Sequence, residues 1–569
     1  MDNKSIAKKL KLTIKLMELH DENSFKIRSY QTALNTIERG DIDLTKLDQE
    51  ALQKINGIGK SLAEVILNLI DTETFPYLED LLGKTPRGLL EVLNLKGLGP
   101  KKVKALWEEL NITSTHELME ACQAGQVAKL KGFGEKTQET IIQSLDFMAS
   151  NLGKWHYAEL DEVVQQLLME LQDRLGKENV ALVGEFARNM EIIDKVEILV
   201  KTEDRKEVWR ILGEIEILEQ DTVKSSPFTW RGKILEPEVK VHFYASEPSK
   251  FISEKLIRTG SPSHLLLPTE EGKTLAEVFS LHAFGSEKEA YEKAGLAYIL
   301  PELREGQFEH KWAKDQVMPK LLMDSDLKGI LHNHSTYSDG KHSLKEMAEY
   351  AYELGYEYLG ISDHSRTAIY AGGLEIEMVK KQQQEIEDLN KTMSPFVIFS
   401  GIESDILLDG SLDYPEEVLQ SFDFVVASIH SSLGMNINKA TSRLLNAISN
   451  PYTTILGHPT GRLLLRRDGY PIDHKTIIDA CALHQVVIEI NANPWRLDLD
   501  WRWVHYAMEK GVKLAINPDA HEKAGYAHMK YGVLVGRKGG LTKEMTLNAL
   551  SAEELKNYFM QRKLEKNPK

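Results

Sequence analysis

Seven short runs with the character of buried strands follow one another through the last 245 residues of the chain, and each ends in polar side chains that can bind a metal ion. Segments with a helical pattern, such as SLKEMAEYAYELG, separate these runs. Apolar strands that alternate with helices favour a parallel barrel, whose functional site lies at the C-terminal ends of its strands. The runs are 328–334, 356–364, 396–406, 423–430, 453–458, 486–493 and 513–521.

The side chains at these seven strand ends are mostly imidazoles and carboxylates. Two residues at i and i+2 on a strand point to the same side, so we expect the imidazoles of His332 and His334 to lie close together. Single positions keep structural alternatives, since His458 before Pro459 could cap a turn and Asp363 could orient a neighbour. Packing does not require such residues at seven consecutive strand ends, so we expect a multi-metal centre. The full set is His332 and His334, Asp363 and His364, Glu403 and Asp405, His430, His458, Glu489 and Asn491, and Asp519 and His521.

The bulk composition indicates a multidomain protein of the cytoplasm. A chain of 569 residues is too long for one ordinary domain. No apolar run approaches the ~18 residues that span a bilayer, and the N-terminus has an amphipathic pattern rather than that of a secretion signal. Two cysteines, Cys122 and Cys481, suggest no disulfide framework. We therefore expect a cytoplasmic protein without a membrane partner, and we expect a monomer.

A weak internal repeat occupies the first third of the chain. The copies LQKINGIGKSLAEVI (52–66), LNLKGLGPKKVKALW (93–107) and AKLKGFGEKTQETII (128–142) each show a helical lead-in, Gly-apolar-Gly and a lysine-bearing helix start. Glycine turns at helix N-termini direct backbone N–H groups outward, where they bind phosphate without reading a base. The net charge is −16 overall, but the first 150 residues carry 20 Lys and Arg against 22 Asp and Glu, which leaves this third free to meet a polyanion. The positions concerned are Gly57, Gly59, Lys60, Gly97, Gly99, Lys101, Lys102, Gly132, Gly134 and Lys136.

This repeat resembles the helix-hairpin-helix motif of DNA-binding proteins, although each copy alone is also compatible with an ordinary helix turn.

Other stretches of the chain resemble family X DNA polymerases. ENSFKIRSYQTALNTIE resembles the opening of their lyase domain, and residues 181–200 resemble their nucleotidyltransferase palm. RTGSPSH (258–264) resembles their nucleotide-binding turn, and PELREG (301–306) resembles the end of the polymerase part. The resemblance implies DNA as the partner, in gapped, nicked or 3′-end form.

The departures from the family X pattern fall on its chemistry. The family's Asp-x-Asp pair corresponds to Lys195 and Glu197, and its third aspartate to His242. Two-metal phosphoryl transfer needs carboxylate oxygens that bridge two magnesium ions, and a lysine places positive charge where those ions belong. The position of the lyase nucleophile is Val65, which cannot form a Schiff base. We therefore expect a palm that has lost DNA synthesis.

The C-terminal motifs HNHSTYSDG, SDHS, GIESDI, SIHSS, GHPTG and NPDAH resemble those of the polymerase-and-histidinol-phosphatase (PHP) family. The resemblance implies up to three metal ions in a distorted seven-stranded barrel. One ion would be held by His332, His334, Glu403 and Asp519, which are also the catalytic positions. A second would use Glu403, His430 and His458, and a third Asp339, His364 and His521. Mixed imidazole and carboxylate ligation suits Mn²⁺, Zn²⁺ or Fe²⁺.

The expected fold is therefore multidomain: an α-helical helix-hairpin-helix region, an α+β nucleotidyltransferase-like palm with a thumb, and a C-terminal α/β (βα)7 barrel. We expect a lyase-like domain at 1–85, a fingers-like domain at 86–150, a degenerate palm at 151–245, a thumb-like domain at 246–320 and a PHP domain at 325–569.

A multi-metal centre in a DNA-binding chain predicts metal-dependent phosphoester hydrolysis, as a 3′→5′ exonuclease or 3′-end phosphodiesterase of DNA repair. Asp363 and Asn491 are expected to support the ligands. Arg462, Arg466 and Arg467 could hold the substrate backbone or be ordinary surface arginines. Three alternatives stay open: an active family X polymerase with an exonuclease, a small-molecule phosphatase of the PHP type, and a non-catalytic DNA scaffold.

Overall fold

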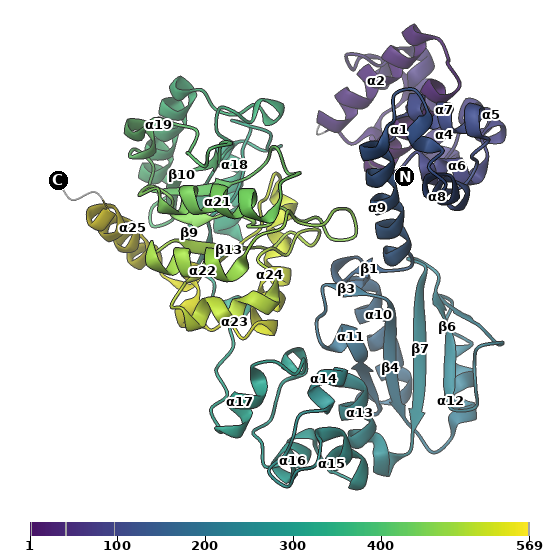
Figure 1. Ribbon diagram of the computed structural model, residues 1–569, viewed down its shortest axis with the longest axis vertical. Coiled ribbons are helices and arrows are strands. Elements are labelled where there is room, and N and C mark those ends of the chain that lie inside the picture. Colours follow the sequence, from purple (N-terminus) through teal and green to yellow (C-terminus); the bar gives the residue numbers. More distant parts are fainter. Residues whose placement is uncertain (2, 40–41, 96, 567–569) are drawn as a thin grey trace. The chain divides into compact units, whose positions relative to one another are not determined.

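The computed structural model describes residues 1, 3–39, 42–95 and 97–566, and it divides into two compact units, Met1–Leu152 and Gly153–Lys569 (Figure 1). The predicted fold class is confirmed: a helical unit comes first, and an α+β part and a parallel α/β barrel follow in the second unit. Among the described helices, none is both long enough and apolar enough to cross a bilayer.

The first unit is a bundle of short helices around one apolar core. A glycine precedes the second helix of every repeat: Gly59 precedes α4, Gly99 precedes α7 and Gly134 precedes α9. The helical lead-in is present as α3 and α6 in the first two copies. In the third copy it is one 3₁₀ turn, Val127–Lys129, so this part of the prediction was wrong there. The helices are α1 (Asn3–Leu19), α2 (Ser24–Arg39), α3 (Gln49–Gln53), α4 (Lys60–Thr72), α5 (Pro76–Lys84), α6 (Arg87–Val92), α7 (Pro100–Leu110), α8 (Thr115–Gln123) and α9 (Glu135–Asn151).

The α+β part of the second unit is a five-stranded sheet in the order β2-β4-β7-β6-β5. Only β4 and β7 pair in parallel, and their register places Glu197 beside His242. The long helix α10 (Tyr157–Leu175) packs its apolar side on this sheet. The strands are β2 (Val180–Val183), β4 (Lys195–Lys201), β5 (Leu218–Gln220), β6 (Thr229–Ile234) and β7 (Val239–Ser246); the helices α11 (Gly184–Ala187) and α12 (Arg205–Leu212) belong to the same part.

Short helices between residues 251 and 314 form a separate apolar cluster after the sheet. At its centre the imidazole of His264 contacts the Glu309 carboxylate at 3.0 Å and the Tyr291 hydroxyl at 2.8 Å, and all three side chains are buried. This pairing satisfies the buried polar groups that the turn after residue 260 brings inside. The helices are α13 (Phe251–Thr259), α14 (Pro262–Leu265), α15 (Leu275–Leu281), α16 (Glu287–Lys293) and α17 (Glu309–Lys314).

The C-terminal sheet has seven parallel strands in the order β14-β13-β12-β11-β10-β9-β8. A parallel bridge between Asn333 and Ala520 joins the chain after β8 to the chain after β14, so the sheet nearly closes into a barrel. Each of the seven predicted runs contains one strand. They are β8 (Gly329–Ile330), β9 (Tyr358–Ile361), β10 (Val397–Asp405), β11 (Phe424–Ser428), β12 (Ile455–Leu456), β13 (Val487–Asn491) and β14 (Leu514–Asn517).

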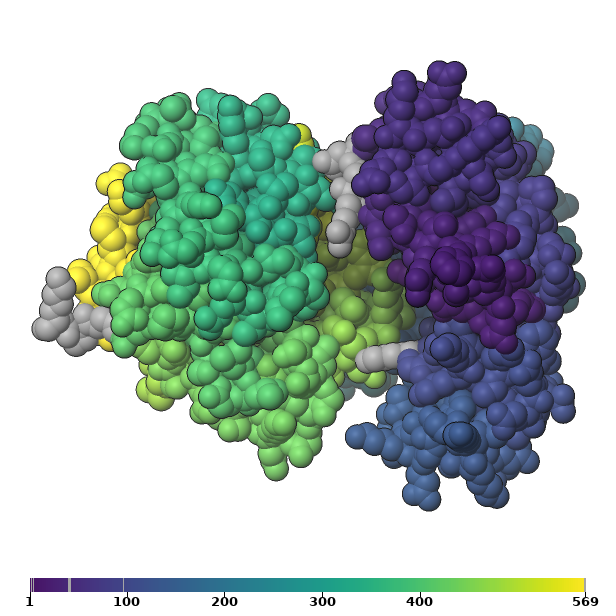
Figure 2. All heavy atoms as spheres, turned by 90° about the horizontal axis from the view of Figure 1, so that it is seen from above, coloured from purple at the N-terminus to yellow at the C-terminus, as the bar shows by residue number. Residues whose placement is uncertain are grey.

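The barrel interior is apolar near the strands' N-terminal ends. Helix α25 (Ala552–Lys566) covers this end and lies against the barrel surface (Figure 2, yellow), where the Phe559 ring stacks on Phe424 and meets Phe399 edge-on. The polar residues are therefore confined to the opposite end. The interior residues, one from each strand or its end, are Leu331, Tyr358, Phe399, Phe424, Ile455, Val487 and Ala515. The outer helices are α18 (Leu344–Glu353), α19 (Ile376–Thr392), α20 (Glu416–Leu419), α21 (Ile437–Ser449), α22 (His474–Leu483), α23 (Trp501–Glu509) and α24 (Met529–Lys538).

Candidate metal centre

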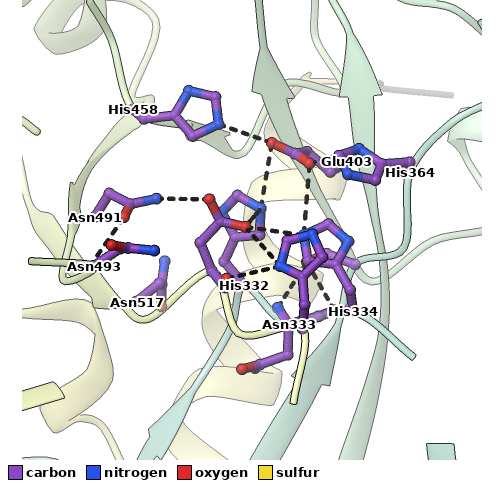
Figure 3. A network of polar contacts seen from close by, with 12 residues as sticks. His332, Asn333, His334, His364, Glu403, His458, Asn491, Asn493 and Asn517 are labelled. Atoms are coloured by element: carbon purple, nitrogen blue, oxygen red, sulfur yellow. Dashed lines mark hydrogen bonds and ion pairs between the residues drawn. The ribbon is translucent and has the colours of Figure 1, made fainter. Parts of the chain in front are cut away.

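All nine expected ligands lie at or after the C-terminal ends of the barrel strands. Figure 3 shows Glu403 of β10 among His332, His334, His364 and His458. Its Oε1 atom lies 3.3 Å from His332 Nε2, 3.1 Å from His430 Nε2 and 3.1 Å from His458 Nε2. Its Oε2 atom lies 2.9 Å from His364 Nδ1 and 3.7 Å from His334 Nε2. One carboxylate therefore faces five imidazoles, four of them fully or almost fully buried.

Asp519 and Asp339 complete the arrangement on the side of β14. His334 Nε2 lies 3.1 Å from Asp519 Oδ1. Asp339 Oδ1 lies 3.3 Å from His521 Nε2 and 3.6 Å from His364 Nε2. Within the described residues, the groups whose ligand atoms all lie within 4.8 Å of one another are His334, Asp339, His364 and His521; His332, His334 and Asp519; and His364, Glu403 and His430.

The donor set fits divalent metal ions, because the protein alone leaves part of it unsatisfied. In the described part of the chain, His332 Nε2, His364 Nδ1 and Glu403 Oε2 are buried without a hydrogen bond of good geometry, although they face one another. Buried polar atoms are normally paired, and several imidazoles aimed at one carboxylate cannot all donate to it. Imidazole nitrogens and carboxylate oxygens that converge in this way are the ligands of Mn²⁺, Zn²⁺ or Fe²⁺.

The pKa values of the imidazoles in the centre shift in opposite directions. Burial, together with the neighbours His521 and His364, lowers the pKa of His334 to about 3. For His430 burial also acts to lower the pKa, but the carboxylates of Glu403 and Asp405 raise it to about 10. The Glu403 carboxyl keeps a pKa well below its usual range, because His430, His332 and His364 outweigh its burial. The Glu403 carboxyl therefore stays ionised in the middle of the centre.

Further polar groups orient the imidazoles from outside. Glu489 Oε2 accepts from His332 Nδ1 at 2.7 Å, and Asp405 Oδ1 contacts His430 Nδ1 at 2.5 Å. The sequence placed both carboxylates at strand ends but did not assign them this role. Carboxylates that hold the far nitrogen of an imidazole fix its tautomer and direct the other nitrogen at the metal.

The two residues expected to support the ligands do so by hydrogen bonds. Asp363 accepts from Ser335 N at 2.8 Å, Ser335 Oγ at 2.6 Å and Gln382 Nε2 at 2.6 Å, so it holds the loop that follows His334. Asn491 Nδ2 donates to Asp519 Oδ2 at 3.1 Å.

The arginines near GHPTG differ in their surroundings. The Arg462 guanidinium donates to Asp500 and to the carbonyl oxygens of Arg496 and Leu497, so it is a structural group and is not available to a substrate backbone. Arg467 donates to the Gly461 carbonyl at 2.7 Å.

Arg496 was not singled out in the sequence. Its Nε lies 3.5 Å from Asp519 Oδ2, and its side chain is partly exposed at the edge of the centre. No spacing rule marks it, because it lies in the loop after β13 rather than at a strand end.

In the five-stranded sheet, the three positions expected to correspond to the family's carboxylates lie together: Lys195 and Glu197 on β4 and His242 on β7. Lys195 Nζ contacts Glu197 Oε1 at 2.7 Å, and the Tyr244 hydroxyl donates to the same oxygen at 2.7 Å. His242 lies beside Glu197 on β7, with Nδ1 3.5 Å from the Tyr244 hydroxyl. Among the described residues, the groups able to hold a metal ion all belong to the barrel and none to the palm.

The second and third glycine turns of the first unit are open to approach, whereas Gly57 in the first turn lies against Thr32 and Thr36. Gly57, Gly97, Gly132 and Gly134 have positive φ, a conformation that other residues rarely adopt. A side chain built at Gly97 or Gly132 would meet nothing within 4 Å, so the backbone there is uncovered. The second and third turns border one hollow, which is lined by Gly97, Lys102 and Lys136. Lys60, Lys101 and Lys136 are exposed at the starts of their helices.

Comparisons with known proteins agree with this arrangement. Family models described as "Helix-hairpin-helix domain", "SAM-like Helix-hairpin-helix tandem" and "PHP domain" match residues 1–75, 89–146 and 331–492. The "DNA polymerase/3'-5' exonuclease PolX" of Bacillus subtilis (strain 168) is 34% identical over 98% of this chain and 99% of its own length. A "Probable phosphatase" of Thermoanaerobacter sp. (strain X514) is 28% identical over 43% of this chain and 96% of its own length. A solved structure of Leishmania infantum polymerase beta covers 38% of this chain and 98% of its own, with 16% identity and a TM-score of 0.23.

Helix-hairpin-helix repeats, an α+β part and a C-terminal PHP barrel with converging imidazoles and carboxylates define a class of DNA polymerase and exonuclease chains. The protein belongs to the family of bacterial family X DNA polymerases that carry a C-terminal PHP domain.

Proposed function

We propose that the protein is a metal-dependent phosphodiesterase that removes nucleotides from DNA 3′ ends, as a 3′→5′ exonuclease or 3′-end processing enzyme of DNA repair. The observation that carries this proposal is the convergence of nine ligand side chains, Glu403 among them, in a chain whose first unit presents two open glycine turns. The Bacillus subtilis relative is named for both polymerase and 3′-5′ exonuclease activity, which supports the choice of DNA as substrate.

The residues of the barrel would hold up to three divalent ions, with Mn²⁺, Zn²⁺ or Fe²⁺ as candidates. His332, His334, Glu403 and Asp519 would bind one ion, Glu403, His430 and His458 a second, and Asp339, His364 and His521 a third. When bound, such ions neutralise charge on phosphoryl oxygens and make water a nucleophile at neutral pH. Glu489 and Asp405 keep two imidazoles turned toward the ions, and Asp363 keeps the loop after His334 in place.

The glycine turns would bind phosphates of the DNA backbone. Backbone N–H groups at the starts of α4, α7 and α9, with Lys60, Lys101, Lys102 and Lys136 beside them, suit phosphates of any sequence. Gapped, nicked and 3′-ended DNA are the expected partners of a monomer in the cytoplasm. The domain limits near residues 85, 150, 245 and 320 belong to the same proposal.

The palm, in this proposal, no longer synthesises DNA. The Lys195 ammonium occupies one side of the Glu197 carboxylate and cancels its charge, so the pair offers no cradle for magnesium ions. The palm would then serve as a rigid support for the barrel.

The central experiment is the degradation of DNA labelled at the 5′ or the 3′ end, with Mn²⁺, by the wild type and by His334→Ala. We expect a ladder that shortens from the 3′ end with the wild type and intact DNA with the variant. His484→Ala, at the end of α22 and outside the centre, is the matched control and should behave as the wild type. Equal degradation by His334→Ala would rule out the assigned centre.

A second candidate function is hydrolysis of small phosphomonoesters, which the Thermoanaerobacter relative favours because it is named a probable phosphatase and matches 43% of this chain. Rapid turnover of a free phosphomonoester with no attack on a DNA 3′ end would select this candidate. Primer extension with dNTPs and Mn²⁺ tests the polymerase alternative, and elemental analysis of the purified protein tests the non-catalytic scaffold.

A further inference from the structure

Two large apolar side chains stand exposed beside the metal centre. Ile369 and Tyr370 lie in the short 3₁₀ turn Ile369–Ala371, five and six residues after the ligand His364. Ile369 is 86% exposed and Tyr370 is 70% exposed. The Tyr370 ring lies 6.1 Å from the ring of His364, centroid to centroid, at an angle of 60°. An uncovered aromatic ring therefore borders the ligand cluster directly.

Hydrogen bonds on both sides of this turn fix its position on the barrel. Thr367 N donates to Asp413 Oδ2 at 2.6 Å, and Thr367 Oγ1 donates to Asp405 Oδ2 at 3.0 Å. Leu374 N returns to the His364 carbonyl at 2.9 Å, so both ends of the loop are fixed on the strand end. Asp405 also holds His430, and it therefore links the loop to the centre itself.

The exposed pair is too small for a protein partner and well placed for a nucleobase. A stable protein interface uses about 20–30 residues on each side. Two side chains offer enough area for one base, and base–aromatic stacking tolerates every base because each has a π-face. If a phosphodiester lies at the ligand cluster, the Tyr370 ring beside His364 is within reach of its nucleoside.

We propose that Tyr370, with Ile369 beside it, stacks on the base of the 3′-terminal nucleotide and so positions the terminal phosphodiester at the centre. This inference rests on the proposed action on DNA 3′ ends and assigns the contact that recognises the end. Because the contact reads no hydrogen-bonding edge, it suits removal of all four nucleotides at similar rates.

The test compares Tyr370→Ala with the wild type on two duplexes that differ only at the 3′ terminus, which carries either a normal nucleotide or a base-free tetrahydrofuran unit. We expect the substitution to lower kcat/KM about 10-fold on the normal terminus, within the range for loss of one stacked base. On the base-free terminus it should change kcat/KM less than about twofold, since no stacking is lost there. Tyr370→Trp should retain activity on both. Tyr352→Ala removes another exposed tyrosine, on α18, and is the matched control.

A binding measurement provides a readout that does not depend on hydrolysis. In the His334→Ala background, 2-aminopurine at the 3′ terminus should lose fluorescence on binding, and Tyr370→Ala in that background should abolish the loss. Equal effects of Tyr370→Ala on both termini, or none on either, would overturn the stacking contact while leaving the 3′-end activity intact. A wild type that attacks neither terminus would overturn the proposed function and the stacking contact together.

Discussion

The palm and the barrel of the second unit both bring polar side chains together on adjacent parallel strands, but the charges they gather differ. In the palm, β4 and β7 place Lys195, Glu197 and His242 side by side, and the ammonium neutralises the carboxylate at 2.7 Å. In the barrel, β10 places Glu403 among imidazoles, which can exchange a proton for a metal ion.

The difference shows that a cradle for metal ions depends on its charges as much as on its backbone. A lysine satisfies its carboxylate permanently, whereas a neutral imidazole leaves a lone pair for a metal. The same kind of strand geometry can therefore place a neutralised carboxylate in one part of the chain and potential metal ligands in another.

The largest effect is expected from removing the metal ions proposed for the barrel. Dialysis of the wild type against a chelator should abolish DNA hydrolysis, and Mn²⁺ or Zn²⁺ should restore it, because the ligands remain in place. Elemental analysis should find up to three ions in the wild type and fewer in Glu403→Ala, which loses the carboxylate shared by two of the proposed sites but keeps Asp339, His364 and His521. A metal content unaffected by Glu403→Ala would show that the ions bind elsewhere.

Lys538 of α24 connects the barrel to Arg188 and Glu305 in the preceding part of the second unit, and a substitution there would break this contact. Its ammonium is buried and donates to Glu305 Oε1 at 2.5 Å and to the Arg188 carbonyl at 2.9 Å. Lys538→Met should lower the free energy of unfolding by about 3 kcal/mol, the low end for a broken buried ion pair, because Arg188 still contacts Glu305. The midpoint of urea unfolding measures the change.

The matched control for this prediction is Lys530→Met, which removes a largely exposed lysine that contacts Asp161 at 2.8 Å. An exposed pair contributes less than about 1 kcal/mol. Equal unfolding midpoints for the two variants would contradict the structural role of Lys538.

The orienting carboxylates allow a finer test within the barrel. Glu489→Gln keeps the shape of the side chain but removes the charge that holds His332 Nδ1, so we expect kcat/KM on DNA to fall about 10–100-fold. Steady-state kinetics over a range of Mn²⁺ concentrations measures the loss. Glu416→Gln, at an exposed position on α20, is the control and should leave kcat/KM on DNA unchanged. An equal fall in kcat/KM for Glu416→Gln would contradict the role given to Glu489.

The smallest effect is expected in the palm. Lys195→Ala should leave DNA hydrolysis within about twofold of the wild type, as surface changes away from a site usually do. Primer extension should stay at background in both proteins, since Glu197 alone cannot hold two magnesium ions. Extension by the wild type would overturn the view that the palm has lost synthesis.

Much of the fold and the position of the ligands could be predicted from local sequence patterns. Apolar runs followed by His332, Glu403 or Asp519 predict strand ends, and parallel strands bring their ends to one edge. The glycine spacing predicted the turns, although the lead-in at Val127–Lys129 is only one 3₁₀ turn, too short for the helix that was expected.

The remaining contacts could not be predicted because they join residues far apart in sequence. Glu489 and His332 are 157 positions apart, and their pairing depends on how the barrel curves. Arg462 has the sequence of a surface arginine, but the fold of the loop before α23 brings Asp500 to it. Tyr370 lies in a turn without a strand or helix pattern, so only the placed structure shows that it borders the centre.

The position of Glu403 has a consequence for how the barrel fills. Because both of its oxygens face imidazoles from different neighbouring subsites, one bound ion alters the charge that the next ion meets. A bound cation neutralises part of the Glu403 charge and repels the next cation, so each further ion should bind more weakly than the one before it. Loading should therefore be stepwise, with partly filled protein present during a titration.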